Sequence, residues 1–200
     1  MQRQLSLIIL WTVCACGPAG EEPDAVVDNK LTQLSQATDP AESLAGLTAT
    51  QKVLKYSYQA QQTGYWCGPA STRIALSARM ASPPSQAQLA AQLGTTTAGT
   101  NHIGLVTGAL NSVLRTTYYE TKWMPSDPPT TAQRDLLWRD ITYDIDRGYA
   151  LVANIVAPAS NHPPCYPSYT IYHYVAVVGY KIDGAGAKWA LVADPANFCG

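Results

Sequence analysis

The chain has 200 residues, which is enough for one domain of about 100–150 residues with further segments at its ends. Hydrophobic residues make up 46% of the sequence and charged residues 14%, a balance typical of a compact domain with a buried core. The net charge is −1 and there is no long basic run, so nucleic-acid binding and electrostatic attachment to a membrane surface are excluded as leading hypotheses.

Residues 1–16 have the pattern of an export signal. Arg3 supplies positive charge, and residues 5–13 form an apolar segment too short to span a bilayer. The ending Val-Cys-Ala-Cys is similar to a bacterial lipoprotein cleavage box with Cys16 as the lipidated residue, although Cys14 stands where a small or β-branched residue is more usual. Ordinary secretory cleavage nearby is the alternative. We expect a periplasmic or cell-surface lipoprotein, or a secreted protein, with any membrane contact made only through this anchor.

Residues 17–53 are mostly small and polar, which predicts a linker or a short propeptide. The folded domain is expected over residues 54–200. Near its start, residues 61–70 read Gln-Gln-Thr-Gly-Tyr-Trp-Cys-Gly-Pro-Ala, in which Cys67 stands immediately before a predicted helix.

This segment predicts half of a thiol acyl-transfer site. Pro69 suits the first helical turn, where its missing N–H costs nothing. A thiolate at Cys67 lies against about +0.5 of helix-terminal charge, which helps lower a cysteine pKa from about 8.5 towards the range of reactive thiols. The amide of Gln61 and the backbone N–H of Cys67 could together stabilise an oxyanion at an attacked carbonyl.

Helices are predicted first along the domain, and strands afterwards. Ser85 and Gln88 have capping-box spacing before the second helix, and Gly94 closes it. The predicted helices span 70–80, 89–93 and 103–114, with a fourth running through Leu137, Ile141 and Ile145 to Gly148. Residues 117–123 are expected to be extended, and 150–156, 172–180 and 189–193 to be buried strands. This order indicates an α+β domain.

A nucleophilic thiol needs a base, and the base needs a group that orients it. Of the three histidines, His102 lies at a helix start and His162 lies in a loop, so both are interpreted as incidental. His173 opens the strand His-Tyr-Val-Ala-Val-Val-Gly-Tyr, where a rigid sheet would hold its ring in place. A lone strand histidine is more often a core residue, but the cysteine segment upstream favours a catalytic interpretation.

Hairpin geometry proposes the third member of the site. A two-residue turn at Asp183-Gly184 would place Asp194 directly opposite His173, with Cβ atoms about 4.5–5.5 Å apart. A longer loop over 183–187 would place Asn197 there instead, and a bulge would also shift the count. The plain structural interpretation of Asp194 is a strand-end cap before a proline.

Removal of the leader would leave Cys67, Cys165 and Cys199, an odd number. In an exported domain, Cys165–Cys199 is the natural disulfide, which leaves Cys67 free. The sequence alone also permits Cys67 to pair with either of the others.

The sequence resembles the double-glycine-peptidase-like (bacteriocin-processing-like) cysteine peptidases, which belong to the wider papain-like fold. Four elements carry the resemblance: Gln61, Cys67-Gly-Pro-Ala six residues after it, His173-Tyr-Val-Ala-Val-Val-Gly-Tyr, and Val-Ala-Asp194-Pro. The resemblance covers about residues 56–197. It implies Cys67 as nucleophile, His173 as base and acid, Asp194 as orienter and Gln61 as oxyanion donor, with Gln62 and Gln59 as alternatives if the loop register differs. It also implies a helical part, with the nucleophile helix packed on a C-terminal antiparallel sheet. No transporter accompanies the domain in this sequence, so cleavage after double glycines is not expected.

These features predict an exported, monomeric cysteine peptidase that acts on peptide or protein substrates without a metal or other cofactor. Cys67, His162 and His173 match no common short-spaced zinc module. Cell-wall peptide hydrolysis or transpeptidation on the same residues is one alternative, because one catalytic set serves several acyl acceptors. A catalytically inactive binding module is the other.

Overall fold

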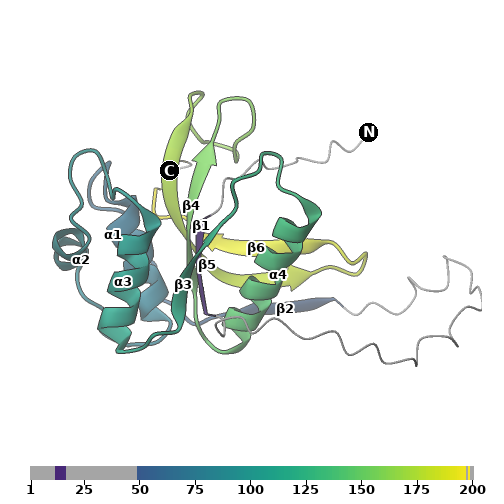
Figure 1. The fold of residues 1–200 in the computed structure, drawn as a ribbon, viewed down its shortest axis with the longest axis horizontal. Coiled ribbons are helices and arrows are strands. Elements are labelled where there is room, and N and C mark those ends of the chain that lie inside the picture. The colour runs from purple at the N-terminus through teal and green to yellow at the C-terminus, as the bar shows by residue number, and fades with distance from the viewer. Residues whose placement is uncertain (1–11, 17–48, 197, 199–200) are drawn as a thin grey trace, which may run out of the picture.

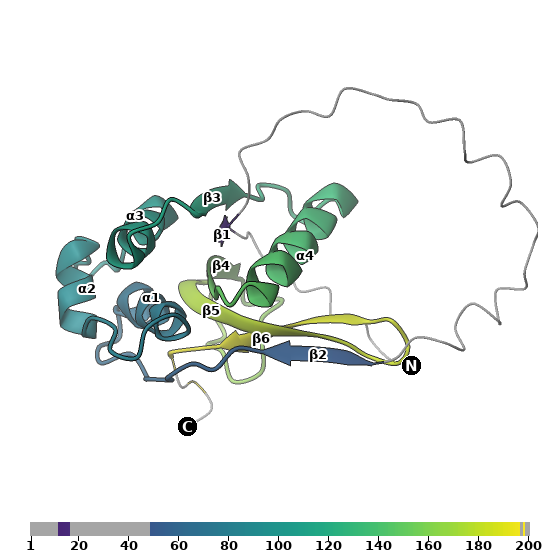
Figure 2. The same cartoon turned by 90° about the horizontal axis from the view of Figure 1, so that it is seen from below.

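The structure is a computed structural model that describes residues 12–16, 49–196 and 198. In this part of the chain, four helices surround a six-stranded antiparallel sheet (Figures 1 and 2). The α+β class predicted from the order of the elements is confirmed. None of the helices in these residues is long and apolar enough to cross a membrane.

The long strand β5 (Ile171–Ile182) organises the sheet. One edge of β5 is shared between β4 (Leu151–Ala157) and β2 (Thr50–Val53), and β6 (Lys188–Ala193) lies on the other edge. Beyond β4 lie β1 (Thr12–Cys16) and then β3 (Tyr119–Trp123). The pairing of β6 with β5 extends only to Ala176, so β6 does not run beside the first residues of β5.

The helices cover both faces of the sheet. Helices α1 (Cys67–Ser77), α2 (Gln86–Gln92) and α3 (Ile103–Leu114) lie on one side, and α4 (Thr131–Asp146) lies on the other (Figure 1). The capping box predicted at Ser85 is present, and Gly94 has a φ of 60° after the end of α2. Thr130 and Gln133 form a second capping box that starts α4, a signal absent from the sequence prediction above.

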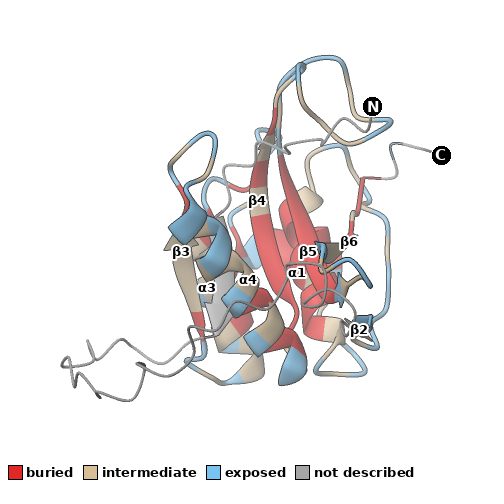
Figure 3. Cartoon of the chain, turned by 90° about the vertical axis from the view of Figure 1, so that its right-hand side faces the viewer, coloured by how far each residue is buried: buried red, intermediate tan, exposed pale blue. Residues whose placement is uncertain are grey.

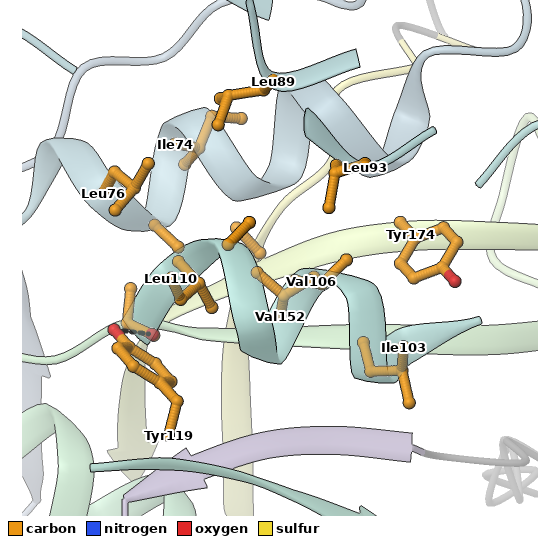
Figure 4. Close-up of a cluster of buried hydrophobic side chains, with 14 of the residues drawn as sticks. Ile74, Leu76, Leu89, Leu93, Ile103, Val106, Leu110, Tyr119, Val152 and Tyr174 are labelled. Atoms are coloured by element: carbon orange, nitrogen blue, oxygen red, sulfur yellow. Dashed lines mark hydrogen bonds between the residues drawn. The ribbon is translucent and has the colours of Figure 1, made fainter. Parts of the chain in front are cut away.

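The core is divided by the sheet, because successive strand residues point to opposite faces. On one face, Tyr174, Ala176 and Val178 of β5 pack against α1, α2 and α3 (Figure 4). On the other face, Val177 packs with α4 side chains such as Ile141. Figure 3 shows β4 and β5 as the most continuously buried strands, which is why they can hold a side chain in one position.

The predicted two-residue turn at Asp183-Gly184 is wrong. Ile182 pairs with Lys188, so the hairpin loop runs over 183–187, which is the longer loop left as the alternative by the sequence, and a bulge shifts the register between Val177 and Gly179. Asn197, which that alternative would place opposite His173, lies outside the described residues. The Asp183 carboxylate explains this loop, because it accepts the backbone N–H groups of Ala185 at 3.0 Å and Ala187 at 2.9 Å. Asp194 therefore does not lie directly opposite His173 in a strand pair.

Two strands fall in segments for which the sequence predicts no strand. β2 occupies the end of the predicted linker, and Lys52 anchors it by an ion pair with Asp146 of 3.0 Å. β1 occupies the end of the predicted export signal, and its last residue, Cys16, pairs with Tyr119 of β3. The remainder of both segments, residues 1–11 and 17–48, lies outside the described residues.

Candidate active site

Cys67 is the first residue of α1, three residues earlier than the predicted helix start. Gly68 lets this helix end approach the turn at Thr100 closely. A Cβ atom added at Gly68 would lie 2.2 Å from the Thr100 hydroxyl oxygen, so only glycine fits without movement. The Thr100 hydroxyl is held in turn by Thr95 at 2.8 Å. The sequence Cys-Gly-Pro therefore combines a helix start with a close approach between two segments.

The end of β6 makes room for α1 beside β5. At Tyr174, α1 contacts the main chain of β5: the Ser71 hydroxyl donates to the Tyr174 carbonyl at 2.8 Å, and the Tyr174 N–H donates to the sulfur of Cys67. The buried Tyr174 side chain also donates to the Thr100 carbonyl at 3.3 Å. These contacts bind the start of α1 to the strand that carries His173.

His173 lies on β5 opposite Ile155 of β4, and its side chain is only 4% exposed. Its Nε2 atom lies 2.7 Å from Oδ1 of Asp194. A histidine ring has two nitrogens, so the hydrogen bond between His173 and the Cys67 sulfur uses Nδ1. The imidazole thus stands between the thiol and the carboxylate.

Asp194 follows the last residue of β6, where Pro195 ends the strand. Its Oδ1 also accepts the N–H of Ala196 at 2.8 Å, and its Oδ2 accepts a short hydrogen bond from the Tyr166 hydroxyl. The Tyr58 hydroxyl donates to the Asp194 main-chain carbonyl at 2.9 Å. The carboxylate reaches His173 from beyond the strand pair, not from the opposed position that a two-residue turn would give.

The environment of Cys67 favours the thiolate. Burial opposes ionisation, but the hydrogen bond from His173, its charge, and the N–H groups of Tyr174 and Gly68 together hold the pKa of Cys67 below its ordinary value. Cys67 is a free thiol, so the alternative in which it forms a disulfide is wrong.

His173 and Asp194 are shifted in the complementary directions. Burial lowers the pKa of His173, but the hydrogen bonds to Asp194 and Cys67 and their charges outweigh it and raise the pKa to about 9. Burial raises the pKa of Asp194, but contacts with His173, the Tyr166 hydroxyl and the Ala196 N–H hold it below its usual range. All three shifts favour the charged forms, which are a thiolate, an imidazolium and a carboxylate in a row.

Gln61 lies in the turn that leads into α1. Its Nε2 donates to the Thr63 carbonyl at 2.9 Å, and its backbone N–H donates to the Pro195 carbonyl at 2.8 Å, next to Asp194. An amide nitrogen carries two N–H bonds, and the contact with Thr63 uses one of them. The two glutamines named as alternative oxyanion donors have other surroundings. Gln62 is exposed, and Gln59 accepts a hydrogen bond of 3.0 Å from the buried Gln86.

The remaining predicted residues lie elsewhere. His102 is the N-cap of α3 without a side-chain capping bond, and Nδ1 of His162 contacts the Pro163 carbonyl at 2.8 Å. Cys165 is disulfide-bonded, as expected for its half of the predicted pair, whereas Cys199 lies outside the described residues.

Tyr166 and Tyr58 contact Asp194, and neither is predicted from the sequence. The motifs that predict Cys67 and His173 depend on local spacing. The contacts of Tyr166 and Tyr58 with Asp194 depend instead on how the loops that carry the two tyrosines fold. An abundance of tyrosine, 12 in the chain, is a signal too general to single them out.

Comparison with known proteins gives one match. A family model described as "Peptidase_C39 like family" matches residues 53–198, which include α1, β5, β6 and the residues around Cys67. No curated protein and no solved structure matches the chain.

Proposed function

Since the chain belongs to the Peptidase_C39 like family, we propose that it is a cysteine peptidase in which Cys67, His173 and Asp194 act as the catalytic triad. The observation that supports this most directly is the continuous chain of contacts from the Cys67 sulfur through the His173 ring to the Asp194 carboxylate. A papain-like arrangement, with the nucleophile at a helix start and the imidazole on the sheet, is part of the proposal.

In the proposed reaction, the Cys67 thiolate attacks the carbonyl carbon of a peptide or amide bond. His173, which carries a proton up to about pH 9, donates that proton to the leaving amine as the carbon–nitrogen bond breaks. The product is a thioester on Cys67. Water then attacks the thioester while His173 takes a proton from it, which releases the acid and restores the thiolate.

The oxyanion of each tetrahedral intermediate needs donors. We assign the second N–H of the Gln61 amide and the backbone N–H of Cys67 to this role, since both belong to the turn that starts α1. Removal of a single such donor costs about 10²- to 10³-fold in turnover in other hydrolases.

We also propose that residues 1–16 direct export, with Cys16 as the lipidated residue of a periplasmic or cell-surface protein. The support is the charged start, short apolar segment and cysteine-ended box of the sequence. The proposed substrates are peptides or unfolded proteins.

The test measures the rate of Cys67 alkylation by iodoacetamide as a function of pH, with the modified peptide identified by mass spectrometry. In the wild type we expect alkylation to continue to a lower pH than for an ordinary cysteine, because the thiolate is lost only as the pH falls through the lowered pKa of Cys67. In His173→Ala the largest ionising partner is gone while burial remains, so reactivity should appear only at alkaline pH.

The matched control is His162→Ala, since His162 contacts the Pro163 carbonyl in a loop and should leave the profile unchanged. Hydrolysis of fluorescein-labelled casein by wild type, absent in Cys67→Ala, completes the test. A correctly folded wild type that alkylates only in the pH range of an ordinary cysteine and does not cleave casein would favour an inactive binding module.

A further inference from the structure

Tyr166 lies in the loop between β4 and β5, and its hydroxyl contacts the proposed catalytic residue Asp194. Its hydroxyl donates to Oδ2 of Asp194, the oxygen that His173 does not use. Oδ1 is occupied by His173 and by the Ala196 N–H. Donors on both oxygens determine the rotation of the carboxylate, so that Oδ1 faces the imidazole.

The Tyr166 ring is itself held in place. It packs against Ala153, Ile155 and Val175 on the face of the sheet opposite α1. It also meets the His173 ring edge-on, with ring centroids 6.0 Å apart and an interplanar angle of 82°. Edge-to-face contacts of this kind stabilise a defined orientation. The hydroxyl is therefore presented to Asp194 by a ring that touches both the sheet and the imidazole.

The residue before Tyr166 gives the loop its shape. Cys165 has a φ of 66°, in the left-handed region that a non-glycine residue seldom adopts, and it is disulfide-bonded. The Tyr166 N–H closes the turn by donating to the Pro163 carbonyl at 3.3 Å. The covalent bond at Cys165 holds this turn, and with it the start of the Tyr166 side chain.

We propose that Tyr166 is a positioning residue that orients Asp194 toward His173, and that the disulfide at Cys165 keeps Tyr166 in place for this role. The proposal deepens the proposed function and rests on it for its catalytic consequence. The phenol suits the role because burial, followed by the hydrogen bond to Asp194 and the charge of Asp194, raises its pKa well above the ordinary value, so it remains a donor.

The experiment compares Tyr166→Phe with wild type by an NMR titration of His173. The substitution keeps the packed ring and removes only the hydroxyl. A carboxylate released from Tyr166 rotates away from the imidazole and stabilises the imidazolium less, so the pKa of His173 should fall by about one unit. The chain contains three histidines, so the His173 signal can be assigned with His102 and His162 variants.

The matched control is Tyr169→Phe, an exposed tyrosine in the same loop, which should leave the His173 titration unchanged. Thermal unfolding of each variant is measured in parallel. If Tyr166 served only to pack the loop, Tyr166→Phe would leave the His173 pKa unchanged. If the Tyr166 hydroxyl only weakened the Asp194 charge, the pKa of His173 would rise in Tyr166→Phe. Either result overturns the proposal.

Cys165→Ser tests the second part. We expect it to lower the His173 pKa in the same direction, with the double variant no lower than Tyr166→Phe alone, because both changes act through one contact. Additive shifts, or no shift in Cys165→Ser, would overturn the role of the disulfide.

Catalysis provides a separate readout. For fluorescein-labelled casein, kcat of Tyr166→Phe should fall about tenfold with little change in KM, in keeping with loss of one hydrogen bond to a charged group. A wild type that does not cleave casein counts against the proposed peptidase function, whereas the His173 titration still decides whether Tyr166 orients Asp194.

Discussion

Tyr174 contributes to the site through its main chain. Its N–H reaches the Cys67 sulfur, and its carbonyl accepts the Ser71 hydroxyl, so one strand residue joins the nucleophile helix to the sheet. These groups are available because β6 stops before it reaches this part of β5. The thiolate is thus stabilised by backbone dipoles whose positions a substitution of the side chain changes little.

Gln61 carries a prediction at the same scale. Gln61→Ala removes the proposed side-chain oxyanion donor, so kcat for fluorescein-labelled casein should fall by about 10²-fold or more. The pH profile of Cys67 alkylation should stay as in the wild type, because alkylation by iodoacetamide forms no oxyanion.

Gln62→Ala is the control for this change, since the exposed Gln62 contributes only its backbone N–H to Gln86, at 3.0 Å. A loss of turnover in Gln62→Ala, with Gln61→Ala fully active, would contradict the assignment and move the donor to the neighbouring position.

The cysteine and histidine motifs, together with the family resemblance, predict Cys67, His173 and Asp194 as a set. The structure brings these three side chains together, although the two-residue turn that favoured Asp194 is wrong. It does so because a helix start, a buried strand and a strand end each leave a local signal. Tyr166 leaves none, since its contact with Asp194 depends on how the loop between β4 and β5 folds back.

At the scale of elements, the close approach of α1 to the 95–100 turn determines where the thiol lies. Gly68→Ala would place a Cβ atom 2.2 Å from the Thr100 hydroxyl oxygen, so helix and turn must move apart. We expect a loss of about 1–3 kcal/mol in the free energy of unfolding, as is typical of overpacking. The displaced Cys67 should also need a higher pH for alkylation.

Gly64→Ala is the matched control, because a Cβ atom at Gly64 meets nothing within 4 Å. For both variants, chemical denaturation gives the free energy of unfolding, and alkylation at a series of pH values gives the reactivity of Cys67. Equal stability and equal profiles in the two would show that the Gly68 contact has no bearing on the site.

In the β5–β6 hairpin, the sequence predicts the two strands but not the turn that joins them. Apolar runs correctly predict both strands, since burial on a sheet demands them. The turn between them is mispredicted, because Asp-Gly is a signal for a two-residue turn only when no competing contact exists. Here the Asp183 carboxylate captures two backbone N–H groups further along and lengthens the loop.

For the molecule as a whole, the α+β class, the helices α1 to α4 and the strands β3 to β6 follow from periodicity, and the family match covers the same region. The order is mixed, because β1 and β2 precede the helices and β3 lies between α3 and α4. β1 and β2 are not predicted, because short edge or inserted strands acquire their structure from the partners they meet. β2 is held by its pairing with β5, and the half-exposed ion pair of Lys52 with Asp146 adds a contact with the end of α4. Such contacts between distant segments have no local pattern.

The pairing of β1 yields a prediction at this scale. A chain that starts at Gly17 loses the strand between β3 and β4, which leaves the facing edges of both without that partner. We expect a lower melting temperature and association that increases with protein concentration. The pH profile of Cys67 alkylation should persist, because α1, β5 and the Asp194 segment pair with other elements.

Differential scanning calorimetry and light scattering compare this chain with the full one. An alkylation profile displaced to higher pH in the shortened chain would instead indicate that β1 supports the site.

The same strand bears on the proposed removal of the leader. In the folded chain, Ala15 pairs with Glu120 and Cys16 pairs with Tyr119, so the bond between them is part of the sheet and these pairs would have to open before it could enter the cleft of an enzyme. If the leader is cut there, the cut has to precede folding. A chain that folds before cleavage would hold residues 12–16 in the sheet and keep its leader. Export of the unfolded chain would therefore be a condition for removing the leader.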